Sequence, residues 1–372
     1  MDFSVLFTVI LSISVTIFIS AEATKTFRPI RTLFQFGDSL SDTGNVIRLL
    51  PVGPTLPAAR LPYGETFPGR PTGRWSDGRL IIDYTTMALG LPLVDPYLDK
   101  NASFRNGVNF AVAGATALNA SFFLSRGILV SSVGSLDTQL RSFRTYLASI
   151  CTTPRECGDY LKRALIFVGE IGGNDINYPL SQGRSLEEIR TYVPFINQAI
   201  ANATREIIRA GATRLVVPGN FPIGCFPFVL AASASNDSAM YDELGCVRSA
   251  NDLAIYQNSN LQITLDALRR EFPYVSIIYA DYYNALLTTF RKAPLFGFNR
   301  TTLLTPCCKS RRYNLLSSEF CGNPTVPVCP DPGQYIHWDG YHLTQEAYRR
   351  ISQYVLPNIL PTIMVISTTT CR

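Results

Sequence analysis

The stretch Thr32-Leu-Phe-Gln-Phe36-Gly37-Asp38-Ser39-Leu40-Ser41-Asp42 decides how this chain is expected to fold. Its first five residues are mainly apolar or β-branched and stop at a glycine, a pattern typical of a short buried strand. Ser39 therefore stands where a strand breaks into a turn, a place from which a hydroxyl can face a ligand. Taken alone, a serine after a strand is more often the N-cap of a helix.

Three other short apolar runs predict further strands, and segments with helical spacing lie between them. The runs are residues 164–168, 214–217 and 275–279. Apolar residues repeat with helical spacing after Ser185 as far as Gly211, and again from Leu253 to Glu271. This alternation predicts an α/β fold, in which helices cover both faces of a central parallel sheet. Ligands of such sheets bind beyond the carboxyl ends of the strands, where Ser39 is expected.

The pattern also predicts a last helix and two long loops. Thr344 can cap the helix. The inner face of that helix would be formed by Ala347, Tyr348, Ile351 and Val355. The loops are segments 50–79 and 300–335, which are rich in Pro. We expect the first loop to cover the site, and the second to be cross-linked by disulfides.

The first 23 residues are expected to be a cleaved signal peptide. An almost wholly apolar stretch ends at Ala21-Glu22-Ala23, which has the small residues that signal peptidase requires. An uncleaved signal anchor is the alternative, because no positive charge precedes the apolar stretch. Residues 24–372 are predicted to form one domain, since 47% hydrophobic residues suffice for a large core and no linker divides the chain.

Cysteines and glycosylation sequons both favour export. Nine cysteines suit an oxidising compartment; their pairing cannot be read from the sequence, and the odd count leaves one unpaired, for which we expect Cys371. The five sequons are at Asn101, Asn119, Asn202, Asn236 and Asn299. We expect an extracellular or cell-wall protein, with the vacuole as an alternative. The net charge of +5 is scattered, so no nucleic-acid partner is expected.

His337 and His342 are the only two histidines of the chain. Histidine is the side chain whose ordinary pKa lies near neutrality, so a hydrolase that needs a general base has few candidates here. Asp339 precedes His342 by three residues, and a turn between them would let the carboxylate orient the imidazole while the other ring nitrogen faces Ser39. Considered alone, this pair is more often an ordinary turn with a surface histidine.

Two glycine-containing segments could supply the donors that acyl transfer requires for its oxyanion. One is Val108–Thr116, in which Gly114 allows a close backbone approach. The other is Gly169–Asp175, in which Asn174 would place an amide at the sheet edge. Each residue would by itself be explained as a turn former.

Together these segments resemble the GDSL lipase/esterase family, also called SGNH hydrolases, and its secreted plant branch. The matching segments are Gly37-Asp38-Ser39-Leu40-Ser41, Asn109-Phe-Ala-Val-Ala-Gly114-Ala, Gly172-Gly-Asn174-Asp175 and Asp339-Gly-Tyr-His342, with 73–83 as a further stretch usual in plant members. The resemblance spans nearly the whole mature chain. It implies a flavodoxin-like three-layer α/β/α fold, and ester hydrolysis through an acyl-serine without a cofactor or a metal.

Carried over by position, the resemblance implies Ser39 as the nucleophile, His342 as the base and Asp339 as its orienting partner. The N–H groups of Ser39 and Gly114 and the side chain of Asn174 would form the oxyanion hole. The chain departs from the Gly-x-Ser-x-Gly elbow of α/β-hydrolases, because a serine replaces the last glycine, and this speaks against a lipase of that fold.

His337 has no role in the family pattern and is expected at the rim of the pocket or on the surface. A metal site made of His337, Asp339 and His342 is an alternative, since it supplies suitable ligand types. It leaves the serine, glycine and asparagine segments unexplained, so no metal is expected.

The expected function is that of a secreted serine carboxylesterase that hydrolyses a short-chain ester, with acetyl as the expected acyl group, of a small specialised metabolite or glycan. Cys307-Cys308 and Tyr313-Asn314 resemble a subgroup containing acetylesterases and choline-ester hydrolases. An acyltransferase with the same triad is one alternative, since water access decides between them. A non-catalytic wall or carbohydrate-binding glycoprotein is another. The expected partner is a small-molecule ester, bound by a monomer.

Overall fold

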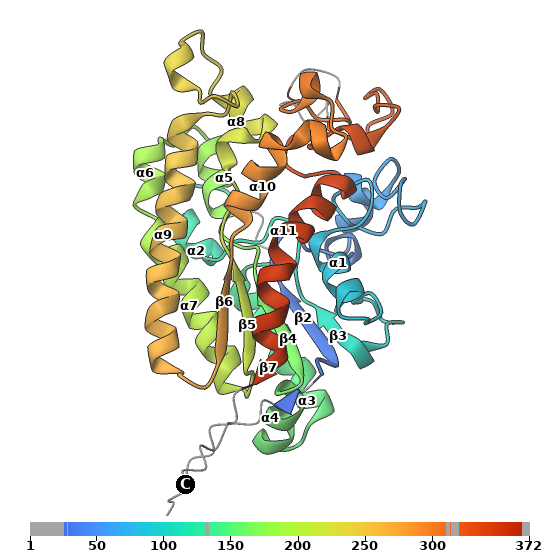
Figure 1. Ribbon diagram of the computed structural model, residues 1–372, viewed down its shortest axis with the longest axis vertical. Helices are drawn as coiled ribbons and strands as arrows, with labels where there is room; N and C mark the ends of the chain where they lie inside the picture. The colour runs from blue at the N-terminus through green and yellow to red at the C-terminus, as the bar shows by residue number, and fades with distance from the viewer. Residues whose placement is uncertain (1–25, 28, 131–133, 310–312, 314–319, 367–372) are drawn as a thin grey trace, which may run out of the picture.

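The computed structural model describes residues 26–27, 29–130, 134–309, 313 and 320–366 (Figure 1). The predicted signal peptide and Cys371 lie outside these residues. Within them, none of the helices is both long and apolar enough to cross a membrane.

A parallel sheet of five strands forms the centre of the protein, with the order β3-β2-β4-β5-β6. The strands are β2 (Thr32–Phe36), β3 (Gly107–Asn109), β4 (Ala164–Val168), β5 (Arg214–Pro218) and β6 (Ser276–Ala280). Counted along the sheet-forming strands, this order is the flavodoxin-like 2-1-3-4-5, so the predicted fold class is confirmed. Near the chain ends, β1 (Thr26–Phe27) pairs antiparallel with β7 (Val365–Ile366).

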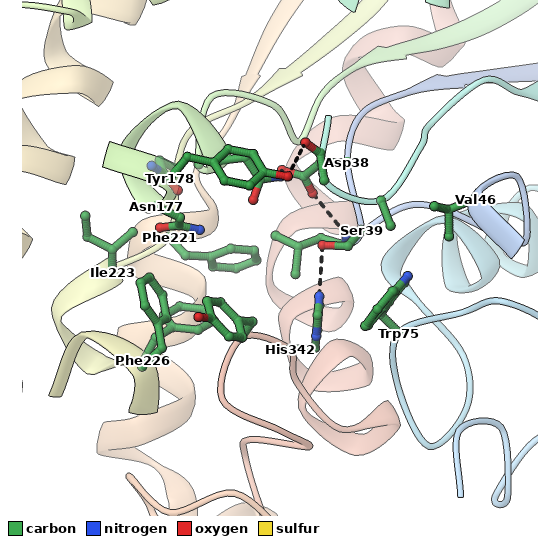
Figure 2. Close-up of a pocket in the computed structure, with 18 of the residues that line it drawn as sticks. Asp38, Ser39, Val46, Trp75, Asn177, Tyr178, Phe221, Ile223, Phe226 and His342 are labelled. Atoms are coloured by element: carbon green, nitrogen blue, oxygen red, sulfur yellow. Dashed lines mark hydrogen bonds between the residues drawn. The ribbon is translucent and has the colours of Figure 1, made fainter. Parts of the chain in front are cut away.

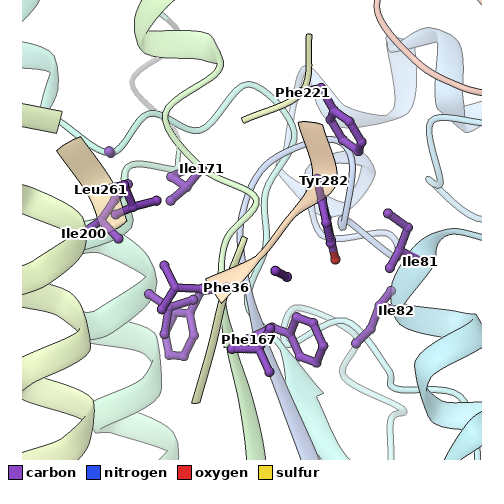
Figure 3. Packing of buried hydrophobic residues seen from close by; sticks show 14 of the residues in the cluster. Phe36, Ile81, Ile82, Phe167, Ile171, Ile200, Phe221, Leu261 and Tyr282 are labelled. Atoms are coloured by element: carbon purple, nitrogen blue, oxygen red, sulfur yellow. The ribbon is translucent and has the colours of Figure 1, made fainter. Parts of the chain in front are cut away.

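Helices cover both faces of this sheet (Figure 1). They are α1 (Ile81–Ala88), α2 (Ala120–Leu124), α3 (Leu136–Ile150), α4 (Pro154–Leu161), α5 (Asn174–Ser181), α6 (Leu186–Arg190), α7 (Val193–Arg209), α8 (Pro227–Ala232), α9 (Arg248–Glu271), α10 (Tyr282–Arg291) and α11 (Gln345–Met364). Helices α1 and α11 pack together on one face, and α7 packs between α3 and α9 on the other. Figure 3 shows the apolar layers that result, with Ile81 and Ile82 of α1 on one side and Ile200 and Leu261 on the other.

Most predicted elements are present, with shifted boundaries. The helix expected after Ser185 is divided into α6 and α7. Pro194 lies at the start of α7, and a proline cannot donate the N–H that would continue α6. Strand β6 begins one residue later than predicted, because the N–H of Val275 is bonded to Phe272 O in a turn.

The last helix follows the prediction closely. The Thr344 hydroxyl accepts a hydrogen bond from the Ala347 N–H at 3.2 Å, which caps α11 as expected. The four residues predicted for its inner face, Ala347, Tyr348, Ile351 and Val355, are all buried.

Disulfides staple the second long loop, as predicted. The pairs Cys307–Cys329 and Cys308–Cys321 both lie in segment 300–335. Two further pairs are Cys151–Cys157 and Cys225–Cys246. All five sequon asparagines are exposed, which attachment of a glycan requires.

Candidate active site

Ser39 and His342 meet beyond the carboxyl end of β2 (Figure 2). The Nε2 atom of His342 lies 2.9 Å from the Oγ atom of Ser39. Hydrogen bonds from two sides hold the turn that carries Ser39. The Gln139 side chain accepts the Gly37 N–H at 2.8 Å and donates to the Gly37 carbonyl at 2.7 Å. The Asp38 N–H donates to the Glu170 carbonyl at 2.9 Å. The serine hydroxyl is thus fixed where the sequence pattern predicts it, opposite an imidazole.

The turn Asp339–His342 orients the imidazole. Nδ1 of His342 lies 2.9 Å from Oδ1 and 2.8 Å from Oδ2 of Asp339, and Oδ1 also accepts the N–H groups of Tyr341 and His342 at 2.7 and 2.8 Å. Burial by itself would raise the pKa of Asp339, but the attraction of His342 and these hydrogen bonds outweigh it, so the pKa lies below its usual value. The carboxylate therefore stays ionised and can stabilise a protonated imidazole.

The three residues expected to bind an oxyanion belong to the lining of one cavity. Ser39, Gly114 and Asn174 all line it. Among the residues that the structure describes, neither the Ser39 N–H nor the Gly114 N–H has an acceptor. The Asn174 amide donates to Ala115 O at 3.0 Å and more weakly to Asp38 Oδ2 at 3.4 Å, so its second N–H can turn to a substrate oxygen at little cost.

Buried polar side chains hold the Gly114 segment against the serine turn. The Asp42 carboxylate accepts the N–H of Ala113 at 2.9 Å, and also those of three residues in its own turn. The Asn45 amide donates to the carbonyls of Asn109 and Ala111 at 2.8 Å each. Gly114 itself has φ +80°, a conformation in which glycine is favoured. These contacts tie the second segment of the sequence pattern to the first.

The cavity has a volume of about 310 Å³ and walls that are mostly aromatic or aliphatic (Figure 2). One wall comes from the segment after β5, and the other from segment 46–75. The apolar lining residues are Leu40, Val46, Leu56, Trp75, Ala113, Tyr178, Phe221, Ile223, Phe226, Phe228 and Tyr341. A concave apolar site with few convergent polar groups is typical of a small-molecule pocket.

The charge of the cavity is unusual for a basic protein. Although the chain has 33 Lys and Arg residues, none lines this cavity within the described part of the chain. Asp38 is its one carboxyl group there, and burial raises the pKa of Asp38 to about 7. The cavity is therefore neutral to negative, which disfavours an anionic substrate.

The prediction for His337 is wrong. It is fully buried and does not line the cavity; its ring lies behind the cavity wall, 5.3 Å from the ring of Phe226 and 5.8 Å from that of Phe290. Burial lowers the pKa of His337 to about 3, so the ring is neutral at physiological pH. The described residues also include no cluster of His, Cys, Asp and Glu that could hold a metal, so the alternative metal site is not supported.

Two aromatic residues of segment 50–79 contact His342 and Asp339 and were missed as site residues. The Trp75 ring lies 5.0 Å from the His342 ring, and the Tyr63 hydroxyl donates to Asp339 Oδ2 at 2.7 Å. Trp75 belongs to segment 73–83, which resembles a stretch usual in plant GDSL esterases. The sequence has no comparable signal for Tyr63, because its contact depends on the path of a long irregular loop.

Comparison with known proteins gives one consistent result. The model of the family described as GDSL-like lipase/acylhydrolase matches residues 33–355. The chain is 57% identical to acetylajmalan esterase of Rauvolfia serpentina, covering 89% of this chain and 86% of that protein. It is also 41% identical to sinapine esterase of Brassica napus, covering 91% of this chain and 88% of that protein. The chain therefore belongs to the GDSL-like lipase/acylhydrolase family and is a carboxylic ester hydrolase.

Proposed function

We propose that this chain is a secreted serine esterase that removes an acetyl group from a small ring-containing metabolite. Ser39 is the nucleophile, His342 the general base and Asp339 its orienting partner in this proposal. The observation that carries it is the 2.9 Å separation of Ser39 Oγ and His342 Nε2 at the edge of a pocket. There the N–H groups of Ser39 and Gly114 have no acceptor among the described residues. Nucleophile, base and oxyanion donors are then within reach of one carbonyl group.

The proposed reaction follows from these positions. Ser39 Oγ attacks the ester carbon while its proton passes to His342 Nε2, and the carbonyl oxygen becomes an oxyanion bound by the N–H groups of Ser39 and Gly114 and by Asn174. The imidazolium then gives its proton to the departing alcohol. Water, activated by the same imidazole, hydrolyses the acyl-serine. Asp339 keeps its negative charge throughout and stabilises the imidazolium.

Two observations support the choice of substrate. Relatives with up to 57% identity are named acetylajmalan esterases, which supports acetyl as the acyl group. The aromatic walls supplied by Phe221, Phe226, Phe228 and Tyr341 suit a flat or polycyclic alcohol better than a flexible polar glycan. Secretion is supported by the apolar N-terminal segment, the disulfides and the exposed sequons.

Hydrolysis of p-nitrophenyl esters by the purified protein tests the proposal. We expect acetate to be hydrolysed faster than butyrate and far faster than palmitate, and Ser39→Ala to remove the activity. Exposed Ser125→Ala is the matched control and should behave as the wild type. Equal rates for the wild type and Ser39→Ala would refute the proposal, and acyl transfer to an added alcohol in preference to water would make the protein an acyltransferase. A panel of acetylated alkaloids, phenolic choline esters and acetylated xylan then identifies the alcohol.

A further inference from the structure

The Asp339 carboxylate receives a hydrogen bond from a residue 276 positions away in the chain. The Tyr63 hydroxyl donates to Oδ2 at 2.7 Å, and Oδ2 is also the oxygen nearest to His342 Nδ1, at 2.8 Å. Tyr63 is only 2% exposed, so water does not compete for this bond. The other oxygen, Oδ1, is already bonded by two N–H groups of its own turn. Among the described residues, Oδ2 is therefore held by two partners, the Tyr63 hydroxyl and the His342 ring.

Aromatic packing holds the phenol in place. The Tyr63 ring stands edge-on to Trp75 and to Trp338, with ring centroids 5.6 and 5.9 Å apart. Trp338 precedes Asp339 directly, so the same packing ties segment 50–79 to the catalytic turn. Burial and the negative charge of Asp339 raise the pKa of Tyr63 well above its usual value, and the hydroxyl remains protonated. It can then only donate to the carboxylate at any working pH.

We propose that Tyr63 is a positioning residue of the esterase, which acts on the substrate only through Asp339 and His342. This inference rests on the proposed roles of those two residues. The phenol holds Oδ2 beside Nδ1, as the two N–H groups of the turn hold Oδ1, and it takes up part of the negative charge. Without the hydroxyl, the imidazole of His342 would be less well oriented. The Asp339 carboxylate would also stabilise its protonated form more strongly.

Tyr63→Phe tests this role, because it removes the hydroxyl and keeps the ring that packs between the two tryptophans. We expect kcat for p-nitrophenyl acetate to fall about 10-fold with KM unchanged, as for the loss of one hydrogen bond to a charged group. We also expect the acidic limb of the kcat/KM profile to move to higher pH, because a more localised carboxylate charge favours the imidazolium. A purely structural role would not move this limb.

Tyr146→Phe is the matched control. Its phenol is also buried and bonded, to Phe104 O at 3.3 Å and to the Tyr160 hydroxyl at 3.2 Å, but it does not touch the site. We expect this variant to keep the wild-type kcat and pH profile. An unchanged kcat and pH profile in Tyr63→Phe, while Ser39→Ala is inactive, would overturn this inference alone. Full activity of Ser39→Ala would overturn the proposed function and this inference with it.

Discussion

His342 Nε2 lies 2.9 Å from Ser39 Oγ although 303 residues separate them in the chain. Ser39 follows strand β2 at the edge of the sheet. His342 follows no strand of this sheet and lies in the loop before helix α11. Their contact therefore depends on how α11 docks against the sheet and α1, and not on the sheet alone.

The two residues should behave as one catalytic unit. We expect His342→Ala and Ser39→Ala each to lower kcat roughly 10⁴-fold, and the double variant to be no slower than either, because proton removal and attack belong to one step. Burst and steady-state kinetics with p-nitrophenyl acetate measure this. Losses that multiply in the double variant would show that the residues act independently.

The neutral state of His337 should make the fold sensitive to acid. The unfolded chain binds a proton at this residue below its ordinary pKa of 6.5, whereas the folded chain does so only near pH 3, so protons favour unfolding between these values. We expect His337→Phe to gain up to about 1.4 kcal/mol in unfolding free energy over the wild type for each pH unit below 6.5. Urea unfolding between pH 4.5 and 7.5 measures the difference. A difference that is constant with pH would contradict a lowered pKa.

The cavity should discriminate esters by charge. Burial raises the pKa of the Asp38 carboxyl to about 7, and no Lys or Arg lines the described cavity, so above this pH we expect a negatively charged alcohol group to be repelled. We expect kcat/KM for an acetylated phenol carboxylate to be on the order of 10-fold below that of its neutral or trimethylammonium analogue. Steady-state rates at pH 8 measure the ratio.

A lysine placed in the wall should reverse this preference. Leu56→Lys introduces a cation among the lining residues, whereas Leu61→Lys adds the same charge at a side chain that is 56% exposed and outside the lining. We expect only the first variant to favour the anionic ester. The same ratio in both variants would mean that the alcohol group does not occupy this cavity.

The disulfide Cys308–Cys321 should support activity as well as stability. Cys308 N–H donates to Trp338 O at 2.9 Å, one residue before the catalytic Asp339 proposed above. We expect replacement of both cysteines by alanine to lower the free energy of unfolding by about 3 kcal/mol and to lower kcat several-fold. Thermal unfolding and steady-state kinetics measure these effects.

The pair Cys151–Cys157 provides the control for this prediction. It joins Cys151 at the end of α3 to Cys157 within α4, and neither cysteine lines the cavity beside Ser39. We expect removal of this disulfide to lower the free energy of unfolding by about 2 kcal/mol and to leave kcat unchanged. Equal losses of activity in both double variants would show that disulfides act on this enzyme only through global stability.

Local patterns predicted the elements better than their junctions. Strand β4 was predicted with its exact ends, because an unbroken apolar run stops at Gly169. The break between α6 and α7 was missed, since the helical spacing of apolar residues continues past Pro194. His337 was misplaced for a related reason. An imidazole is usually polar and exposed, and only the packing of Phe226 and Phe290 around it makes the site apolar.

The sequence by itself determined the strands, the serine turn and the Asp339–His342 turn, because each depends on residues that are close in the chain. Only the tertiary structure decided that Ser39 faces His342, that Tyr63 bonds Asp339, and that the cavity has aromatic walls and no Lys or Arg among its described lining residues. These contacts join segments hundreds of residues apart through irregular loops. Their paths are set by packing and buried hydrogen bonds, which leave no periodic trace in the sequence.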